Sequence, residues 1–317
     1  MFTDASPGRL TMGAPMNGTK QVITAKSNRK GERLIAFGWY GGKFSHLEWL
    51  LPLLPPCQHF CEPFAGSAAV LINRKPSPIE TYNDVDGEVV NFFKTLRDQR
   101  EELVQSIGLT PFSKREFELA ITEPADNLTP VERARRFYIR ARQVRTGLAQ
   151  TASVGRWAHC TLTSRAGMAG AVSRWLGAIE HLPDIAQRLL RVQFENAAAI
   201  EVINRYDSKN TLFYCDPPYP HETRGDSKAY GYEMTDEAHA ALAAVLNKCQ
   251  AKVAVSSYHS SLNDEIFKGW RCIEATEKLC HSVKTLRQEV LFVNYDPEDL
   301  TPYLQPRQVS LLTSDDE

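Results

Sequence analysis

Short apolar runs alternate with longer amphipathic stretches along the chain from Phe37 onward. Strands are predicted where short runs are mostly apolar or aromatic, at 58–61, 79–83, 212–215, 253–256 and 290–294. Helices are predicted at 68–73, after Asp84 and at 235–246. The helix after Asp84 would bury one face, which is formed by Val85, Val89, Phe93 and Leu96. Strands that alternate with helices predict an α/β fold.

Residues 111–199 break this alternation, because their pattern is helical and contains few strand-like runs. We predict that they form an inserted, mostly helical domain between the two parts of a sheet domain, 34–110 and 200–305. Residues 1–33 are rich in Gly, Ser, Thr, Asn and Lys without periodicity, which predicts a mobile arm. Residues 306–317 end in polar and acidic residues and predict a flexible tail.

Neither a membrane span nor a secretory leader is expected from the sequence. The longest apolar run, at 47–54, is interrupted by prolines and is far shorter than the roughly 18 residues that a span needs. No compact apolar stretch with a small-residue cleavage site follows the N-terminus. The seven cysteines form no C-x-x-C pair and the eight histidines no H-x-x-x-H pair. We therefore expect a cytoplasmic protein without a metal site.

The formal charge of −1 hides a strong asymmetry along the chain. Residues 133–194 contain eleven arginines, no lysine and only two acids, Glu180 and Asp184. This segment carries a net charge of +9, so the rest of the chain carries −10. A basic segment within an acidic protein predicts a face that binds a polyanion.

The turn at 62–67, Glu-Pro-Phe-Ala-Gly-Ser, lies between a predicted strand and a predicted helix. Gly66 would let the backbone approach a ligand closely, and Ser67 would cap the helix. Only one of the three glycines of the dinucleotide fingerprint is present, so a mononucleoside ligand fits better than a pyrophosphate. Asp84 ends the next strand, where an acid can bind both hydroxyls of a ribose. The alternative interpretation is a tight turn with a helix-capping Asp.

A second glycine-containing segment, Gly-Trp-Tyr-Gly-Gly-Lys, occupies 38–43. It is not a phosphate-binding P-loop, because Phe37 replaces the first glycine and Phe44 replaces the Ser or Thr that holds magnesium. ATP or GTP hydrolysis is therefore not expected. The aromatic pair and Lys43 would suit a carboxylate-bearing ligand, whereas a turn that carries core aromatics is the alternative.

The tetrapeptide Asp216-Pro217-Pro218-Tyr219 follows the apolar run at 212–215 and is the most specific signal in the chain. A buried strand would deliver the acid at its carboxyl end, and the two prolines would fix the next residues in an extended turn. The Asp216 carboxylate and the Pro217 carbonyl are acceptors that suit the two hydrogens of an amino group. Tyr219 offers a flat face for stacking on a base. A rigid proline loop with an N-capping Asp is the alternative.

In this order the motifs resemble the Dam-like family of DNA adenine-N6 methyltransferases, and within it the α group. The resemblance spans about residues 35–300 and rests on 39–43, 62–67, 83–84, 216–219 and 287–294. In that group the target-recognition domain lies between the methyl-donor motifs and the D-P-P-Y motif. The resemblance therefore implies a Rossmann-like methyltransferase sheet with helices on both faces and a recognition domain at 111–199.

The resemblance also implies a methyl donor, S-adenosylmethionine, and no metal. The positions that it assigns to the donor are Trp39, Tyr40, Lys43, Glu62, Phe64, Ala65, Gly66, Asp84 and Asp216. Within this set, 64–66 would line the adenosyl pocket and Asp84 would hold the ribose. The positions that it assigns to catalysis on the target adenine are Asp216, Pro217, Pro218 and Tyr219.

The implied reaction is site-specific methyl transfer to the N6 amino group of an adenine flipped out of double-stranded DNA. Asp216 and the Pro217 carbonyl would accept hydrogen bonds from the amine and free its lone pair for in-line attack. The arginines expected to bind DNA are Arg135, Arg136, Arg140, Arg142 and Arg145. A cognate restriction endonuclease is the protein partner that such an enzyme would have.

Three alternatives follow from the same sequence. Cytosine-N4 methyltransferases share the chemistry but more often carry Ser at the position of Asp216. A DNA-binding protein without activity would keep the fold, although every donor and catalytic position is filled here. A metal-dependent nuclease could be assigned from Pro183-Asp184 and Asp207-Ser208-Lys209, two short patterns that chance easily produces.

Overall fold

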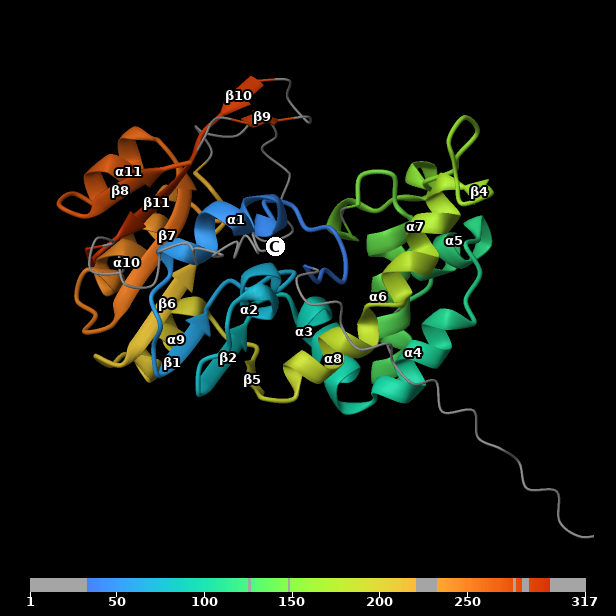
Figure 1. Ribbon diagram of the computed structural model, residues 1–317, viewed down its shortest axis with the longest axis horizontal. Helices are drawn as coiled ribbons and strands as arrows, with labels where there is room; N and C mark the ends of the chain where they lie inside the picture. The colour runs from blue at the N-terminus through green and yellow to red at the C-terminus, as the bar shows by residue number, and fades with distance from the viewer. Residues whose placement is uncertain are drawn as a thin grey trace, which may run out of the picture.

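A computed structural model describes residues 33–124, 127–147, 149–220, 233–275, 278–280 and 285–296 of the chain. Except for Arg33, the predicted N-terminal arm lies outside the described residues, and so does the predicted tail at 306–317. Figure 1 shows a half built on a sheet beside a half built from helices.

The central sheet consists, among the described residues, of β1 (His59–Glu62), β2 (Ile79–Asn83), β5 (Val192–Glu195), β6 (Thr211–Cys215), β7 (Lys252–Tyr258), β8 (Arg271–Glu274) and β11 (Glu289–Val293). Their order is β5-β2-β1-β6-β7-β11-β8. The five strands from β5 to β7 are parallel, whereas β11 is antiparallel to both of its neighbours. After β1, the strands β2 and β5 lie on one side of it, and β6 then pairs with its other side. The order therefore reverses between β1 and β6, which is where open α/β sheets bind ligands.

The helices and helical turns that the structure describes are η1 (Lys43–His46), α1 (Leu47–Leu50), η2 (Leu51–Leu53), α2 (Ala69–Asn73), α3 (Gly87–Asp98), α4 (Arg100–Gly108), α5 (Lys114–Thr122), α6 (Pro130–Gln143), η3 (Ala149–Thr151), η4 (Val154–Arg156), α7 (Gly170–Ile179), α8 (Leu182–Leu189), α9 (Ala199–Tyr206), α10 (Asp236–Leu246) and α11 (Ser261–Ile266). Two short hairpins complete the fold, β3 (Ser164–Arg165) with β4 (Met168–Ala169) and β9 (Lys278–Cys280) with β10 (Thr285–Arg287). None of the helices in the described part of the chain is long and apolar enough to cross a bilayer.

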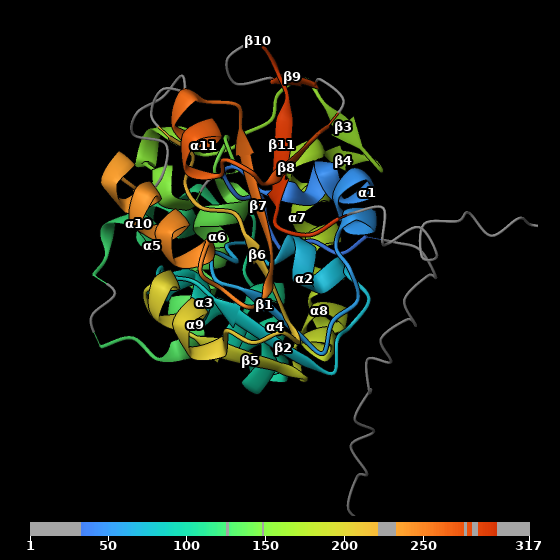
Figure 2. The same cartoon turned by 90° about the vertical axis from the view of Figure 1, so that its left-hand side faces the viewer.

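Alternating side chains of the sheet strands enter two separate cores. On one face, Phe213 and Val253 pack with Val202 of α9 and Leu246 of α10. On the other face, Phe60, Leu212 and Tyr214 pack with Leu47 of α1 and Val70 of α2. Figure 2 shows α9 and α10 on one side of the sheet and α1 and α2 on the other. The predicted α/β sheet with helices on both faces is confirmed.

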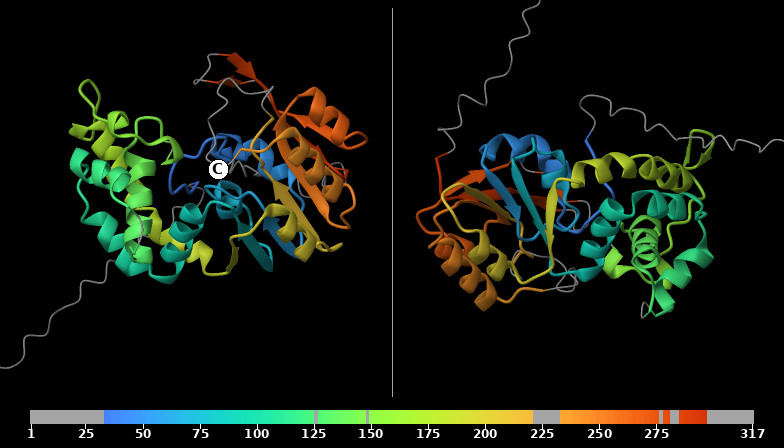
Figure 3. Two further views of the ribbon diagram at one scale, coloured as in Figure 1. Left: turned by 180° about the vertical axis from the view of Figure 1, so that it is seen from behind. Right: turned by 90° about the horizontal axis from the view of Figure 1, so that it is seen from below.

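The helical half shares the second of these cores. Phe92 of α3 stacks on Tyr138 of α6 with ring centroids 5.5 Å apart, and Tyr138 in turn contacts Trp175 of α7. Across the boundary of the two halves, Arg188 of α8 forms an ion pair at 2.6 Å with Glu80 of β2, which is fully buried. Figure 3 shows the two halves side by side from behind and from below.

The predicted elements match the structure closely, with three differences in the part of the chain between β1 and β6. The predicted strands correspond to β1, β2, β6, β7 and β11, and the predicted helix at 235–246 is α10 with Thr235 as its N-cap. The helix after Asp84 begins later than predicted, because Asp86 caps α3 by accepting from the Glu88 N–H. Val85 therefore lies outside the helix and is 49% exposed, so its predicted burial is wrong.

The second difference concerns Ser67, which does not cap α2. The N-cap position is Ala68, in a left-handed conformation, and no side chain caps this helix. The third difference concerns the return to the sheet. Residues 192–195 form β5 and pair with β2, although they fall in the range 111–199 predicted as helical. The predicted domain boundaries stay a prediction.

Candidate active site

A pocket opens at the switch point between β1 and β6. The residues that line it are Trp39, Tyr40, Gly41, Gly42, Lys43, Glu62, Phe64, Ala65, Gly66, Ser67, Ala69, Val70, Asp84, Val85, Asp86, Gln150, Tyr214, Asp216 and Pro218. Each position that the sequence assigned to the donor is in this set. Most of the residues come from the ends of three neighbouring strands, from the turn and helix α2 that follow β1, and from 39–43, whereas Gln150 comes from η3.

The turn after β1 is held in a conformation that requires glycine. Gly66 has φ +47°, and the Nε1 atom of Trp39 lies 2.5 Å from where a Cβ on Gly66 would stand. The Tyr82 hydroxyl donates to the Gly66 carbonyl at 2.8 Å, and Asn83 donates to the Pro63 carbonyl at 2.8 Å. Strand β2 thus fixes the turn of β1, and the indole of Trp39 covers it.

Asp84 organises the same turn with its carboxylate. One oxygen accepts from the Gly66 N–H at 2.8 Å, and the other accepts from the Asp86 N–H at 2.9 Å. Burial raises the pKa of Asp84 to about 6, and these two backbone hydrogen bonds oppose the rise. Each oxygen keeps a further acceptor position, which is what two ribose hydroxyls need.

Glu62 ends β1 with a buried and unsatisfied oxygen. Its side chain is 2% exposed, and its Oε1 has no hydrogen-bond partner. Burial raises the pKa of Glu62 well above its usual range, and the nearby charge of Asp216 raises it further. An acceptor left unpaired in a pocket wall is costly unless a ligand satisfies it. The residues present therefore fit a ligand that carries an ammonium group.

Asp216 directly follows β6 and lies in a cluster of charged groups. Lys43, which is 3% exposed, donates to the two carboxylate oxygens of Asp216 at 2.7 and 2.8 Å and to the Gly41 carbonyl at 2.6 Å. Burial raises the pKa of Asp216 to about 6, an effect that Lys43 opposes and Glu289 reinforces. Asp216 is thus an ionised acceptor at neutral pH, although it is close to protonation.

Tyr219 lies behind this carboxylate rather than along the pocket. Its hydroxyl donates to Glu289 of β11, and its ring meets that of Tyr258 edge to face at 4.8 Å. Burial raises the pKa of Tyr219 well above its usual range, and the Glu289 charge adds to this shift, so the phenol stays protonated. The stacking role predicted for Tyr219 stays a prediction.

Several residues of the site were not predicted from the sequence. Val85 and Asp86 follow Asp84 and were assigned only to a helix, whereas Tyr214 was read as a core residue of a strand. Glu289 lies in the closing segment that carried the family resemblance, so a signal for it was present. Gln150 had none, because it reaches the pocket from the basic helical segment.

The arginines of α6 are partnered by acids of α6 itself and of other elements. Arg135 forms ion pairs with Glu116 at 2.7 Å and Glu132 at 2.7 Å. The other ion pairs are those of Arg136 with Glu132 and Glu123, and of Arg140 and Arg133 with Glu88. The net charge of +9 counted over 133–194 therefore overstates the free charge of these arginines, because all four of their partner acids precede residue 133. DNA contact by Arg135, Arg136 and Arg140 stays a prediction.

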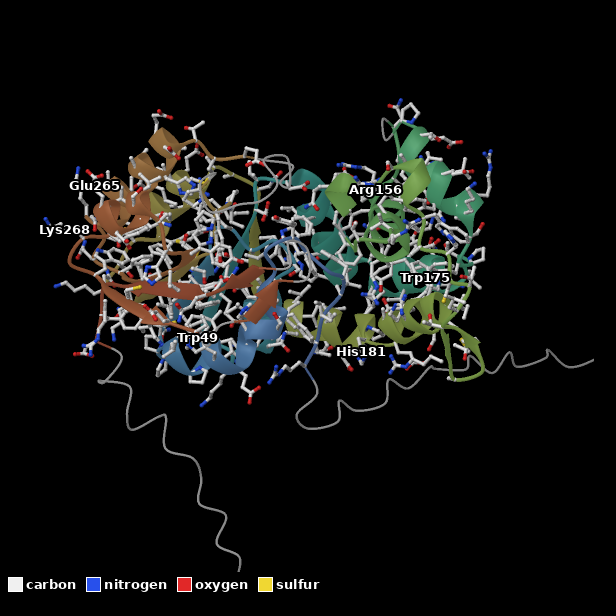
Figure 4. The ribbon with its side chains drawn as sticks, turned by 90° about the horizontal axis from the view of Figure 1, so that it is seen from above. Trp49, Arg156, Trp175, His181, Glu265 and Lys268 are labelled. Atoms are coloured by element: carbon white, nitrogen blue, oxygen red, sulfur yellow. The ribbon has the colours of Figure 1, made fainter. Side chains whose placement is uncertain are left out.

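Arg142 and Arg145 are placed differently. Arg142 donates to the Arg174 carbonyl at 3.0 Å, and Arg145 is exposed in the turn after α6. Figure 4 places Arg156 and Trp175 in this helical half, at the opposite end of the molecule from Glu265 and Lys268. The exposed arginines of this half include Arg145, Arg156, Arg165 and Arg174.

The structure does not support the nuclease alternative. The Asp207 carboxylate accepts from the N–H groups of Gln250 and Ala251, at 3.1 and 2.9 Å, and so anchors the loop before β7. In the part of the chain that the structure describes, no group of three His, Cys, Asp or Glu side chains is placed to hold a metal ion.

Comparisons with known proteins agree with this geometry. Over 248 residues the chain is 24% identical to DNA adenine methylases of two Vibrio cholerae strains, covering 73% of this chain and 83% of theirs. Over 68 residues it is 38% identical to a DNA N-6-adenine-methyltransferase of Escherichia phage P1, which covers 22% of this chain but only 9% of the phage protein. Residues 39–285 match the model of a protein family. The chain belongs to that family, the D12 class of N6 adenine-specific DNA methyltransferases.

Proposed function

We propose that the chain transfers a methyl group from S-adenosylmethionine to the N6 amino group of an adenine that is flipped out of double-stranded DNA at a specific sequence. One observation supports the proposal most directly. The nucleoside-binding groups of the β1–β2 side and the Asp216 carboxylate of the β6 side line one pocket.

Each part of the donor has a candidate partner in the pocket. The unsatisfied Oε1 of Glu62 would accept from the donor ammonium, and this contact would lower the pKa of Glu62 toward its usual range. Asp84 would accept from the ribose hydroxyls with the acceptor positions that Gly66 and Asp86 leave open. Trp39 would shield one side of the ligand from water. The donor supplies an electrophilic methyl group on a sulfonium.

Asp216 and the Pro217 carbonyl would activate the target amine. The lone pair of an adenine amine is delocalised into the ring, which makes it a poor nucleophile. Two acceptors on its hydrogens favour a tetrahedral nitrogen and stabilise the positive charge that develops during attack. Asp216 acts as an acceptor in this step, because a carboxylate is too weak a base to deprotonate the amine first.

The target base would have to leave the duplex to reach this pocket, because both acceptors lie at the end of a buried strand. Phosphate contacts would come from Arg142 and Arg145, which are not held in the ion pairs of α6. We retain Tyr219 as the residue that packs on the flipped base.

Sequencing DNA from cells that express the chain, with detection of modified bases, tests the proposal. We expect N6-methyladenine at one short sequence motif, and none in cells that express the Asp216→Ala variant. Modified cytosine at a motif would favour the cytosine-N4 alternative instead. The motif also allows a test of the cognate restriction endonuclease that we propose as a partner, because such an enzyme would cut only the unmethylated site.

A further inference from the structure

Glu289 is a buried carboxylate in the active-site cluster for which the proposed reaction has no role yet. It begins β11, the strand that is antiparallel to both of its neighbours, and it is 4% exposed. Its Oε1 accepts from the Tyr219 hydroxyl and lies 3.2 Å from the Lys43 ammonium. Glu289 therefore contacts both the lysine that binds Asp216 and the tyrosine that ends the tetrapeptide.

The hydrogen bonds of Lys43 show how the cluster is shared. An ammonium has three donors. In this structure Lys43 donates to the Gly41 carbonyl and to both oxygens of the Asp216 carboxylate, and its ammonium lies 3.2 Å from Glu289. The ammonium also lies 5.0 Å from the centre of the Tyr219 ring. Lys43 thus joins the segment before η1 to strands β6 and β11.

The net charge of the cluster depends on Glu289. Lys43, Asp216 and Glu289 together carry one positive and two negative charges. Without Glu289, Lys43 would neutralise Asp216 alone, and the cluster would have no net charge to offer a developing cation. Electrostatic stabilisation of this kind is strong because the groups are buried and already oriented.

We propose that Glu289 is a positioning residue for methyl transfer, which acts by sharing Lys43 with Asp216 so that the cluster as a whole stays negative toward the target amine. The hydrogen bond from the Tyr219 hydroxyl anchors Glu289 in this place. The inference rests on the proposed function, because it assumes that Asp216 accepts from an amine that becomes positively charged.

A double-mutant cycle of Lys43→Met and Glu289→Gln tests this inference. The amide oxygen of Gln still accepts from Tyr219, but it cannot neutralise Lys43. We expect Glu289→Gln to lower kcat about tenfold or more, as removal of one preorganised group does. In the Lys43→Met background the same change should cost less than about threefold, because residues that act through one contact are not additive. Glu274→Gln, on neighbouring β8, is the matched control and should keep the parent activity.

Donor affinity, measured by calorimetry without DNA, separates positioning from binding. We expect Glu289→Gln to change it by less than about threefold, because Glu289 contacts Lys43 and Tyr219 and does not line the pocket. An equal cost of Glu289→Gln in both backgrounds would overturn the inference. A loss of donor affinity as large as the loss of kcat would overturn it too.

The melting temperatures of the same set of variants provide a test that does not depend on activity. Lys43→Met leaves two buried carboxylates, Asp216 and Glu289, without their cation, whereas the double variant leaves only one. The double variant should therefore melt at a higher temperature than Lys43→Met alone, even if the single variant is barely folded. A double variant no more stable than Lys43→Met contradicts the pairing. If the parent chain methylates no DNA, the proposed function is refuted. The melting temperatures of the variants would still show whether Lys43 and Glu289 interact.

Discussion

The indole of Trp39 lies directly against Gly66, with its Nε1 atom 2.5 Å from the position that a Cβ would take. Trp39 belongs to the segment before η1, whereas Gly66 belongs to the turn after β1. The two glycine-containing motifs, separate in the sequence, thus form one wall of the pocket.

Gly66→Ala should weaken donor binding because the methyl group would displace Trp39 and strain a residue at φ +47°. A left-handed conformation costs about 1 kcal/mol or more for a residue with a Cβ, and loss of Trp39 packing adds to this cost. We expect at least a roughly tenfold loss of S-adenosylmethionine affinity in calorimetry, a change equivalent to about 1.4 kcal/mol. Gly177→Ala is the control, since a Cβ there meets no atom within 4 Å. Equal donor affinity in both variants would refute the assignment of this wall.

The pH dependence of the reaction should reflect the raised pKa values of two buried carboxyl groups. The pKa of Asp84 and the pKa of Asp216 are each raised to about 6 by burial. Both groups act as acceptors in the proposed reaction, so they must be ionised. As the pH falls through about 6 they become protonated, and kcat/KM for the donor should fall with them, because this ratio reports groups of the free enzyme. A profile that stays flat down to pH 5 would contradict these roles.

Two pairs of arginine substitutions should separate DNA contact from folding. Arg142→Gln with Arg145→Gln should lower DNA affinity and reduce the salt dependence, by roughly 0.9 in log–log slope for each arginine that no longer binds a phosphate. Arg135→Gln with Arg136→Gln should instead lower the melting temperature, because these side chains form ion pairs with Glu132. Anisotropy titrations at several salt concentrations, with thermal melts of each variant, measure both effects. An unchanged salt slope in the first pair would place the DNA contacts elsewhere.

The strands of the sheet centre and most residues that line the pocket could be predicted from the sequence, because both depend on local patterns. The run Leu-Phe-Tyr-Cys that precedes Asp216 is apolar throughout, as a strand covered on both faces must be. Edge strands β5 and β8 were missed because each has a solvent-facing side and a mixed composition.

Contacts between residues distant in the chain could not be predicted in the same way. The partners of the α6 arginines come from α3 and α5 as well as from α6 itself, so counting acids within one segment gave a misleading charge. Gln150 reaches the pocket only because the basic segment packs against the sheet domain. The position of Asp216 at the end of a buried strand was predictable from its motif, whereas the lysine and glutamate around it are brought together by the fold.

Methyl transfer by the purified chain and by its Asp216→Asn variant tests the central claim most directly. Each protein is incubated with isotopically labelled S-adenosylmethionine and unmethylated duplex DNA, and the DNA is digested to nucleosides for mass spectrometry. We predict label in N6-methyladenine for the parent chain and a loss of about a hundredfold or more in the variant, which keeps the shape of Asp216 but not its charge. Label in N4-methylcytosine, or near-normal transfer to adenine by the variant, would contradict the proposed reaction.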